Sequence, residues 1–228
     1  MISIIIPVLN EERALPGLLA NLRSLAAPEH GSIEVLVVDG GSEDRTRQIV
    51  RGDGARLVEA DRGRGVQIQT GAEEAAGQLL LVVHADARLP HGAMRQVERA
   101  VAEGSRWGWF DIRYDAPGAW LRFVARYLNV HASLLGSPTG ENAMWATREA
   151  WEAVGGCPRI PLMEDAVLAR RLKRLSGGRR LPGPVVCSAR RFHAWTPLGM
   201  SARCTMLRLL FHLGASPHWL QRFYPEVR

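Results

Sequence analysis

Residues Leu79 to Pro90 read LLLVVHADARLP, and this stretch decides the fold. Its five apolar residues, Leu79 to Val83, are typical of a strand that is buried on both faces, as in the middle of a parallel sheet. His84 and Asp86 follow directly, so they lie at the carboxyl end of that strand, the edge where open α/β sheets bind ligands. An aspartate is also common there as a simple turn residue, and both interpretations stay open.

Similar strands precede this stretch and alternate with helices. Ile2 to Val8 and Ile33 to Val38 are apolar, β-branched runs that end in turns, and Ala55 to Glu59 is a shorter run. Leucines at helical spacing lie between the first two runs, from Leu15 to Leu25. This alternation predicts an α/β fold in which helices flank a parallel sheet with right-handed crossovers.

Several local predictions concern the segments between these elements. Ser42 is expected to cap a helix over Glu43 to Val50. Arg62 to Gly65 is expected to be a flexible basic loop ahead of a helix over Val66 to Ala76. Glycine and proline gather in Gly177 to Pro184, which predicts another loop.

Composition limits the class of protein. The chain has 228 residues, enough for a full core, and its 46% hydrophobic residues are ordinary for a globular protein. A net charge of +6 suits an anionic partner, although scattered arginines explain it equally well. The three cysteines lack metal-ligand spacing, which indicates reduced thiols in the cytosol. We expect neither a signal peptide nor a membrane-spanning segment.

Four motifs together give the chain a family resemblance. In order they are IPVLNEE (Ile6 to Glu12), VVDGGSEDRT (Val37 to Thr46), HADARLP (His84 to Pro90) and GGCPRIPLMEDAVLARRL (Gly155 to Leu172). By their order and spacing, the chain resembles a family-2 glycosyltransferase of the GT-A fold. The resemblance implies a Rossmann-like, mostly parallel sheet with a smaller mixed portion. It also implies one domain over residues 1–228, with a nucleotide-binding half (1–103) and an acceptor-side half with C-terminal helices (104–228).

The resemblance assigns the nucleotide to the ends of the first strands. Pro7, Asn10 and Glu11 would border its base and ribose, and Asp39 would hydrogen-bond one of them. Nothing in the spacing of these residues says which of the two Asp39 contacts.

The phosphates of the donor would lie near the fourth strand. Asp86 matches the last aspartate of the family's DxD motif, which binds a divalent cation, Mn²⁺ or Mg²⁺, that bridges the phosphates. His84 replaces the first aspartate, and it either contacts the ribose or the metal or simply packs at the strand end. Arg64 and Arg191 would reach the diphosphate, whereas a solvated loop is the alternative for Arg64.

The resemblance places the catalytic base on the opposite side of the reacting sugar. Asp165 matches it, because an inverting displacement needs a carboxylate there to take the proton of the acceptor hydroxyl. Glu164 is the second candidate, and the alternative is that both residues merely cap a helix. Glu141 and Asn142 resemble the turn that lines the acceptor side.

We therefore expect an inverting, metal-dependent glycosyltransferase that uses a nucleotide-diphosphate sugar, most simply a UDP-linked one. The ending LLFHLGASPHWLQRFYP (Leu209 to Pro225) is similar to that of a short subgroup, some of whose members glycosylate lipid-like acceptors such as carotenoid acids. This resemblance implies a lipid-like acceptor. It also implies peripheral contact of Trp120 to Leu135 and Met206 to Leu220 with the cytoplasmic face of a membrane. Ordinary core packing is the alternative for both segments.

Two other functions stay open. A catalytically silent module that binds a sugar nucleotide fits the basic charge and the altered DxD motif, but it has no need of Asp165. A sugar-nucleotidyltransferase would have a glycine-rich, basic loop after the first strand, where this chain has Asn10 to Glu12. Nucleic acid is not an expected partner, because the chain lacks a surface strand with clustered aromatic and basic residues.

Overall fold

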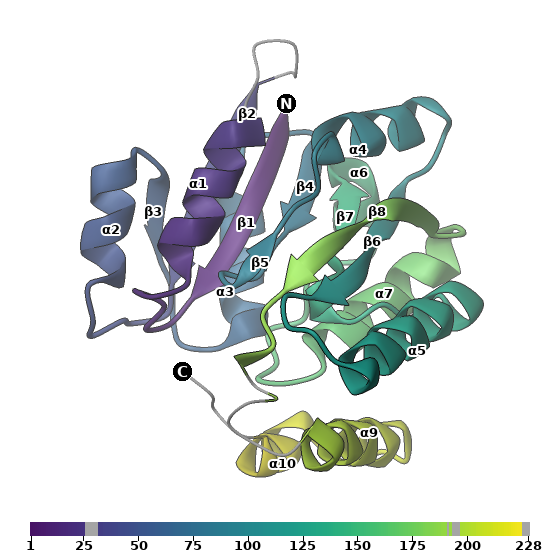
Figure 1. Ribbon diagram of the computed structural model, residues 1–228. Coiled ribbons are helices and arrows are strands. Elements are labelled where there is room, and N and C mark those ends of the chain that lie inside the picture. Colours follow the sequence, from purple (N-terminus) through teal and green to yellow (C-terminus); the bar gives the residue numbers. More distant parts are fainter. Residues whose placement is uncertain (26–31, 191, 193–196, 225–228) are drawn as a thin grey trace.

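One mixed sheet runs through the part of the chain that this computed structural model describes, residues 1–25, 32–190, 192 and 197–224. Within that part, eight strands have the order β3-β2-β1-β4-β7-β6-β8-β5 (Figure 1). Their bounds are β1 Ile2–Val8, β2 Ile33–Asp39, β3 Arg56–Glu59, β4 Leu79–Val82, β5 Ala87–Arg88, β6 Trp107–Tyr114, β7 Trp145–Thr147 and β8 Arg179–Cys187.

The first four strands in the order make the parallel portion. β1 pairs in parallel with β2 and β4, and β2 pairs in parallel with β3. The register sets Val8 opposite Asp39 and Ile5 opposite Val82, so these strands end at one edge of the sheet. Their apolar runs are buried on both faces, as the sequence predicts for strands at the centre of a parallel sheet.

The other portion of the sheet is mixed. β7 pairs antiparallel with both β4 and β6, β8 pairs in parallel with β6, and β5 pairs antiparallel with β8. The prediction of a loop over Gly177 to Pro184 is wrong, because β8 runs through it. A register shift between Phe110 and Ile112 places Pro182, Gly183 and Pro184 outside the ladder, so the strand continues past three residues that normally end one.

Helices cover both faces of the sheet. One apolar cluster packs α1, α2, α4 and α5 against one face, and a second packs α3, α6 and α7 against the other. The helical bounds are α1 Leu15–Leu25, α2 Thr46–Asp53, α3 Arg64–Glu74, α4 Ala93–Ala102, α5 Ala119–Leu135, α6 Arg148–Ala153, α7 Glu164–Leu175, α9 Pro197–His212 and α10 Pro217–Leu220, with 3₁₀ turns η1 Gly140–Asn142 and η2 Gln221–Phe223.

Two helix starts differ from prediction. The hydroxyl of Ser42 does not cap α2, because it accepts a hydrogen bond from the Asn10 backbone N–H at 2.9 Å. Asp44 lies nearer the helix and accepts from the Thr46 N–H at 2.9 Å. Arg64 is the first residue of α3 instead of part of a flexible loop. Gly65 does not mark a loop. It lies within α3, where the absence of a side chain lets the helix pack against the backbone of the segment before α7.

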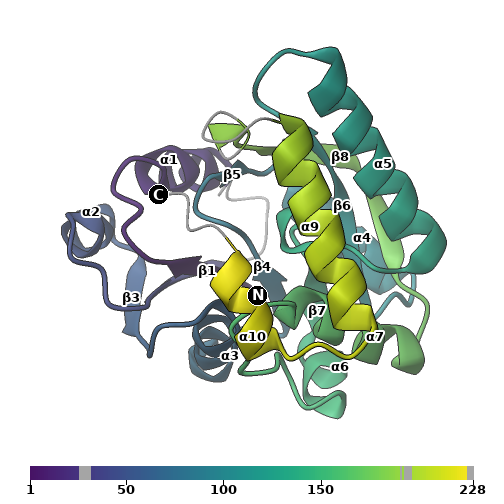
Figure 2. The same cartoon turned by 90° about the horizontal axis from the view of Figure 1, so that it is seen from below.

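The C-terminal helices form a layer of their own. α9 and α10 lie beyond the edge where β1, β2 and β4 end (Figure 1), and α9 lies beside α5 when the molecule is seen from that end (Figure 2). Leu207 and Leu220 attach this layer to Leu162 and Met163, the two residues before α7. None of the helices in the described ranges has the length and apolar character needed to cross a membrane.

Candidate active site

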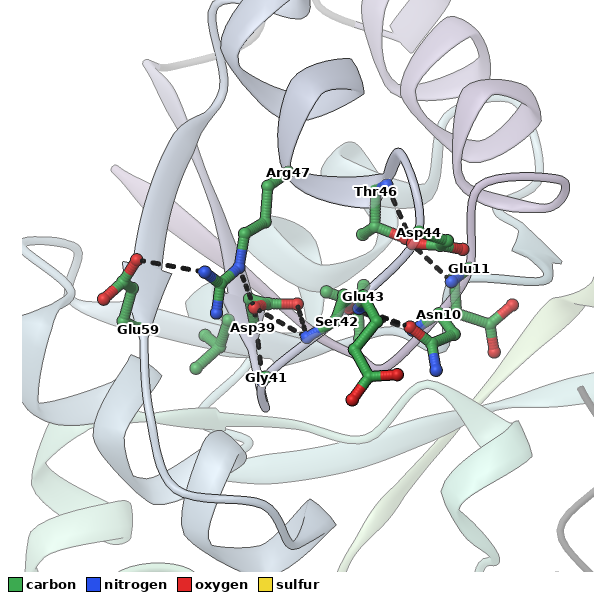
Figure 3. Close-up of polar contacts among 12 residues, drawn as sticks. Asn10, Glu11, Asp39, Gly41, Ser42, Glu43, Asp44, Thr46, Arg47 and Glu59 are labelled. Carbon is green, nitrogen blue, oxygen red and sulfur yellow. Dashed lines mark hydrogen bonds and ion pairs between the residues drawn. The ribbon is translucent and has the colours of Figure 1, made fainter.

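The loops after β1 and β2 are joined by hydrogen bonds between backbone and side chains (Figure 3). The Glu43 N–H donates to Asn10 Oδ1 at 2.8 Å, and the Glu11 N–H donates to Thr46 Oγ1 at 2.8 Å. Asn10 adopts a left-handed backbone conformation with φ 55°, which asparagine tolerates better than most residues. The two predicted nucleotide-binding residues Asn10 and Glu11 therefore lie on a cradle that is already ordered.

Asp39 organises the second of these loops from inside. Its carboxylate is fully buried and accepts hydrogen bonds from the backbone N–H groups of Gly41 at 3.2 Å and Ser42 at 3.1 Å. Arg47 Nε donates to the same carboxylate at 2.6 Å (Figure 3). Burial alone would raise the pKa of Asp39, but the hydrogen bonds from Ser42 and Arg47 lower it. Asp39 thus has a structural role here, and its contact with a nucleotide stays a prediction.

Gln67, which the sequence analysis did not single out, ties the ends of β1 and β2 together. Its Nε2 donates to the carbonyl oxygens of Val8 at 2.7 Å and Val38 at 2.8 Å, and the residue is buried. Pro7 precedes Val8 and is partly exposed on β1. The sequence did hold a sign of this role of Gln67, because a glutamine beside Ile68 on the buried, otherwise apolar face of α3 needs hydrogen-bond partners inside the fold.

Arg190 binds two of the predicted donor-site carboxylates at once. Its guanidinium forms a two-pronged ion pair with Glu11, at 2.8 and 2.7 Å, and its Nε lies 2.9 Å from Asp86 Oδ2. Three segments far apart in sequence therefore meet at this point. The predicted phosphate contact Arg191 and the nearby His193 lie outside the described residues.

The donor side does not present a ready-made metal site. Arg190 engages the carboxylates of both Asp86 and Glu11. The described residues contain no group of three or more His, Cys, Asp or Glu side chains that could hold a metal ion. His84 packs against Gly140, where an added Cβ would lie 2.8 Å from His84 Nε2. As arranged, these residues do not fit a divalent cation, which would have to displace Arg190 from Asp86.

Asp165, the predicted base, lies in the first turn of α7. Its Oδ2 accepts a hydrogen bond from the Gly140 N–H at 2.7 Å, and its Oδ1 accepts from the Ala166 N–H at 2.7 Å. Met163, just before α7, has a left-handed backbone with φ 67°, a strained conformation of the kind that collects at functional sites. The carboxylate is partly exposed and lines a cavity together with His84. Its position suits a base.

Glu164 points elsewhere. Its side chain is 1% exposed and forms an ion pair with Arg64, and Oε2 is buried with no hydrogen-bond partner among the described residues. Burial raises the pKa of Glu164, although the charge of Arg64 opposes this. The pair links the first residues of α3 and α7. This geometry suits a residue that positions Arg64 better than one that removes a proton from a substrate.

The two predicted acceptor-side residues play different parts in η1. Glu141 lines the cavity, and its Oε2 accepts a hydrogen bond from the Tyr114 hydroxyl at 2.9 Å. Asn142 is fully buried, accepts from the Thr139 N–H at 2.8 Å and donates to the Phe110 carbonyl at 2.8 Å. Asn142 therefore fixes the shape of the turn from inside the fold.

The cavity beside Asp165 has a volume of about 880 Å³. Arg64, His84 and Asp165 form part of its lining, and most of the remainder comes from α5 and α9. These two helices lie side by side in Figure 2. The predicted base thus opens onto a large, mainly apolar space.

A family model described as Glycosyl transferase family 2 matches residues 3–149. The chain belongs to this family. The match spans the donor-side motifs and η1 and ends before Asp165. It confirms the predicted family, and the predicted class of enzyme follows from it.

Similar curated proteins include two transferases of the same name. Undecaprenyl-phosphate 4-deoxy-4-formamido-L-arabinose transferase from Pseudomonas paraeruginosa is 31% identical over 140 residues, which is 57% of this chain and 41% of the relative. The protein of that name from Aeromonas hydrophila is 28% identical over 140 residues, 56% of this chain and 41% of the relative. The chain thus matches well under half of their length.

Solved structures confirm the GT-A fold. S. aureus TarS 1-349 in complex with UDP has a TM-score of 0.65 at 17% identity, over 82% of this chain and 60% of that one. Glucosyl-3-phosphoglycerate synthase from Mycobacterium tuberculosis, in complex with Mn²⁺, UDP and phosphoglyceric acid, has a TM-score of 0.62 at 22% identity, over 94% of this chain and 78% of that one. At these identities the likeness shows the fold alone.

Proposed function

We propose that this family-2 domain transfers a sugar, with inversion, from a nucleotide-diphosphate sugar to a lipid-like acceptor. The observation on which the proposal depends is the position of Asp165, whose carboxylate shares the lining of a large apolar cavity with His84. His84 follows β4 and is two residues from Asp86, at the edge where the donor-side loops lie. A base, a donor-side edge and an apolar space therefore adjoin one another.

In the proposed reaction, an acceptor oxygen that carries a proton, an alcohol hydroxyl or the P–OH of a lipid phosphate, lies in the cavity and attacks the anomeric carbon of the donor. The new oxygen–carbon bond forms as the bond to the leaving diphosphate breaks, and the hydroxyl proton passes to the Asp165 carboxylate. Gly140 holds Asp165 by its N–H, so the base does not need to reorient. A general base of this kind contributes a factor of about 10² to 10⁴ in rate.

We propose UDP as the nucleotide. The support is that TarS was solved with UDP-GlcNAc and the mycobacterial synthase with UDP, and both have the fold of this chain. Asn10, Glu11 and Asp39 lie on the joined loops that would receive it, while Arg64 lines the adjoining cavity.

Metal dependence is the part of the proposal that the geometry favours least. The synthase was solved with Mn²⁺, and Asp86 would be the protein ligand here. Arg190 now engages that carboxylate at 2.9 Å, so Mn²⁺ or Mg²⁺ would have to compete with a guanidinium. When bound, such a cation would offset charge on the leaving diphosphate.

We propose a lipid-like acceptor and a site of action on the cytoplasmic face of a membrane. The relatives are named for undecaprenyl phosphate, a lipid-linked acceptor. The helices beside the cavity expose large apolar side chains, among them Phe123 at 58% and Leu209 at 58%. Exposed apolar patches of this kind mark contact with membranes or other proteins.

The first test is calorimetric titration of UDP and GDP into wild type and Asp86→Ala, with and without Mn²⁺. We expect UDP to bind, and GDP to bind at least about tenfold more weakly. Loss of any Mn²⁺ effect in Asp86→Ala would identify Asp86 as the ligand. If UDP binds equally well with and without Mn²⁺ to both proteins, the reaction does not depend on a metal at Asp86. Asp61→Asn, which removes an exposed carboxylate, serves as the control.

A catalytically silent binding module remains the second candidate, because Arg190 occupies the carboxylate that the DxD motif would offer a metal. It predicts UDP binding without transfer from UDP-glucose or UDP-GlcNAc to undecaprenyl phosphate. Transfer in that assay would eliminate the silent module.

A further inference from the structure

Three basic side chains line the cavity where α9 lies beside α5. Arg208 and His212 of α9 and His131 of α5 all belong to the lining. The Nη2 atom of Arg208 is buried and has no hydrogen-bond partner in the described ranges. The same ranges contain no ion pair between Arg208 and a carboxylate. A positive charge thus borders a mainly apolar space without a counter-charge from the part of the chain that the structure describes.

The carboxylates of the cavity are engaged with other groups. Glu141 accepts from the Tyr114 hydroxyl, and Asp165 accepts from the Gly140 N–H. Burial and then the nearby charge of Arg208 lower the pKa of His131, so this imidazole is neutral at pH 7. Charged groups that leave water normally gain a partner of opposite charge. The buried Nη2 of Arg208 lacks such a partner among the described residues, and an anionic group of a ligand would supply it.

Most of the remaining lining is apolar. Phe123 and Tyr127 of α5 and Leu207 and Leu209 of α9 all belong to the lining of the cavity. A volume of about 880 Å³ falls in the range of sites that bury most of a medium-sized organic ligand, roughly 300 to 1,000 Å³. The apolar part of the lining, between α5 and α9, suits a hydrocarbon chain better than a sugar or a nucleotide.

We propose that this chamber binds an amphiphile that has one acidic group and one long apolar chain, with the acidic group on Arg208 and the chain between α5 and α9. The inference rests on the proposed function, since the amphiphile is the acceptor that enters the cavity containing Asp165. A lipid phosphate and a long-chain carboxylate share this chemistry, and the test separates them.

The test titrates three probes of equal chain length, below their micelle concentrations, into the whole chain. Dodecyl phosphate, dodecanoate and dodecanol differ only in the head group. We expect the acidic probes to bind about tenfold or more tightly than the alcohol, as a hydrogen bond to a charged group predicts. The tighter of the two acids identifies a phosphate or a carboxylate as the preferred head group.

Variants of Arg208 test whether this side chain binds the acidic head group of the probes. Arg208→Met keeps an apolar stem and should remove the preference for the acids, while Arg208→Lys keeps the charge and should retain most of it. Arg126→Gln, an exposed arginine of α5 outside the chamber, is the control and should bind the probes as wild type does.

A second pair of variants tests where the hydrocarbon chain of the amphiphile binds. Phe123→Ser changes a chamber wall and should weaken all three probes by about tenfold. Leu134→Ser changes a side chain of α5 that is 77% exposed and outside the chamber, and it should not alter probe binding. Both residues are exposed enough that neither variant should unfold the protein.

The inference is overturned if dodecanol binds as tightly as the acids, or if Arg208→Met leaves the preference for acids intact. It is also overturned if no probe binds. UDP titration into the same samples separates this failure from failure of the proposed function. UDP binding without probe binding rejects the chamber alone. Probe binding without UDP binding rejects UDP as the donor nucleotide and leaves the chamber.

Discussion

The donor-side loops and the α5–α9 end of the molecule are built in opposite ways. On the donor side, Asn10, Asp39 and Ser42 direct their polar atoms to backbone N–H groups of the facing or same loop. At the α5–α9 end, large apolar side chains face outward instead, with Leu134 exposed by 77% and Leu213 by 75%. The first region is fixed by its own hydrogen bonds, and the second leaves surface for something else to cover.

The exposed apolar side chains are confined to that second region. Apart from Met1, the large hydrophobic side chains that are exposed among the described residues all lie between Trp120 and Phe223. They belong to α5, α9, α10, η2 or the turn after α9. A protein that only needed to fold would not gather them at one end. The difference agrees with the proposal that the donor side binds a polar ligand and the α5–α9 end an apolar one.

The largest effect is expected where the two regions meet, at Asp165. Asp165→Asn keeps an oxygen that can accept from the Gly140 N–H, but it cannot take a proton from the acceptor. Transfer from UDP-glucose or UDP-GlcNAc to undecaprenyl phosphate should fall by about 10² to 10⁴-fold, while UDP affinity changes little. Product formation and calorimetric titration measure the two quantities separately.

Glu141→Gln is the matched control, because Glu141 is the other carboxylate of the cavity and bonds a hydroxyl instead of facing the reaction. It should lower transfer by roughly tenfold at most, through one weakened hydrogen bond. Near-normal transfer by Asp165→Asn would remove Asp165 from the role of base. A larger loss in Glu141→Gln would move that role to Glu141.

A smaller effect, on stability, is expected from the donor-side loops. The pKa of Asp39 is lowered on folding, so its contribution to stability is present above the unfolded pKa of about 4 and is lost as pH falls through the folded value. Asp39→Asn should lower the free energy of unfolding by about 2 kcal/mol at pH 7. The difference from wild type should shrink at pH 3, as urea unfolding at both pH values would measure.

Asp61→Asn removes an exposed carboxylate from the next loop and should change the free energy of unfolding by less than about 0.5 kcal/mol at either pH. If Asp39→Asn were as mild as this control at pH 7, the donor-side loops would not be fixed by Asp39. The contrast between the two ends of the molecule would then rest on the apolar residues alone.

Sequence patterns predicted the parts of this fold that depend on neighbours in the chain. The buried runs of β1, β2 and β4 and the leucine spacing of α1 are local, and so is the acidic start of α7. The family motifs singled out Asp165 as a base and Glu141 as an acceptor-side residue, and the structure places both in the lining of one cavity. Local pattern and motif order were sufficient for these features.

Contacts between distant segments could not be predicted in this way. Arg190 meets Glu11 across 179 residues of sequence, and no periodicity or turn rule describes that encounter. The same holds for Gln67, which bridges β1 and β2, and for β8, where a bulge accommodates Pro182 and Gly183. The sequence also could not separate Glu164 from Asp165, because only the fold places Arg64 beside the first of them.

The smallest effect on stability should come from the exposed apolar side chains, whose removal should change membrane binding instead. The double variant Leu134→Ser, Leu213→Ser removes two of the most exposed of them, neither of which lines the chamber. Because a leucine side chain buried in a bilayer contributes about 1.5 to 3 kcal/mol, sedimentation with anionic vesicles at low salt should fall by about tenfold or more. The free energy of unfolding should stay within about 0.5 kcal/mol of wild type, since both side chains already face solvent.

Vesicles of neutral phosphatidylcholine separate the apolar contribution from attraction by the exposed Arg122 and Arg126. If wild type does not sediment with anionic vesicles, the α5–α9 end does not contact a membrane, and its exposed side chains must be covered by a different partner.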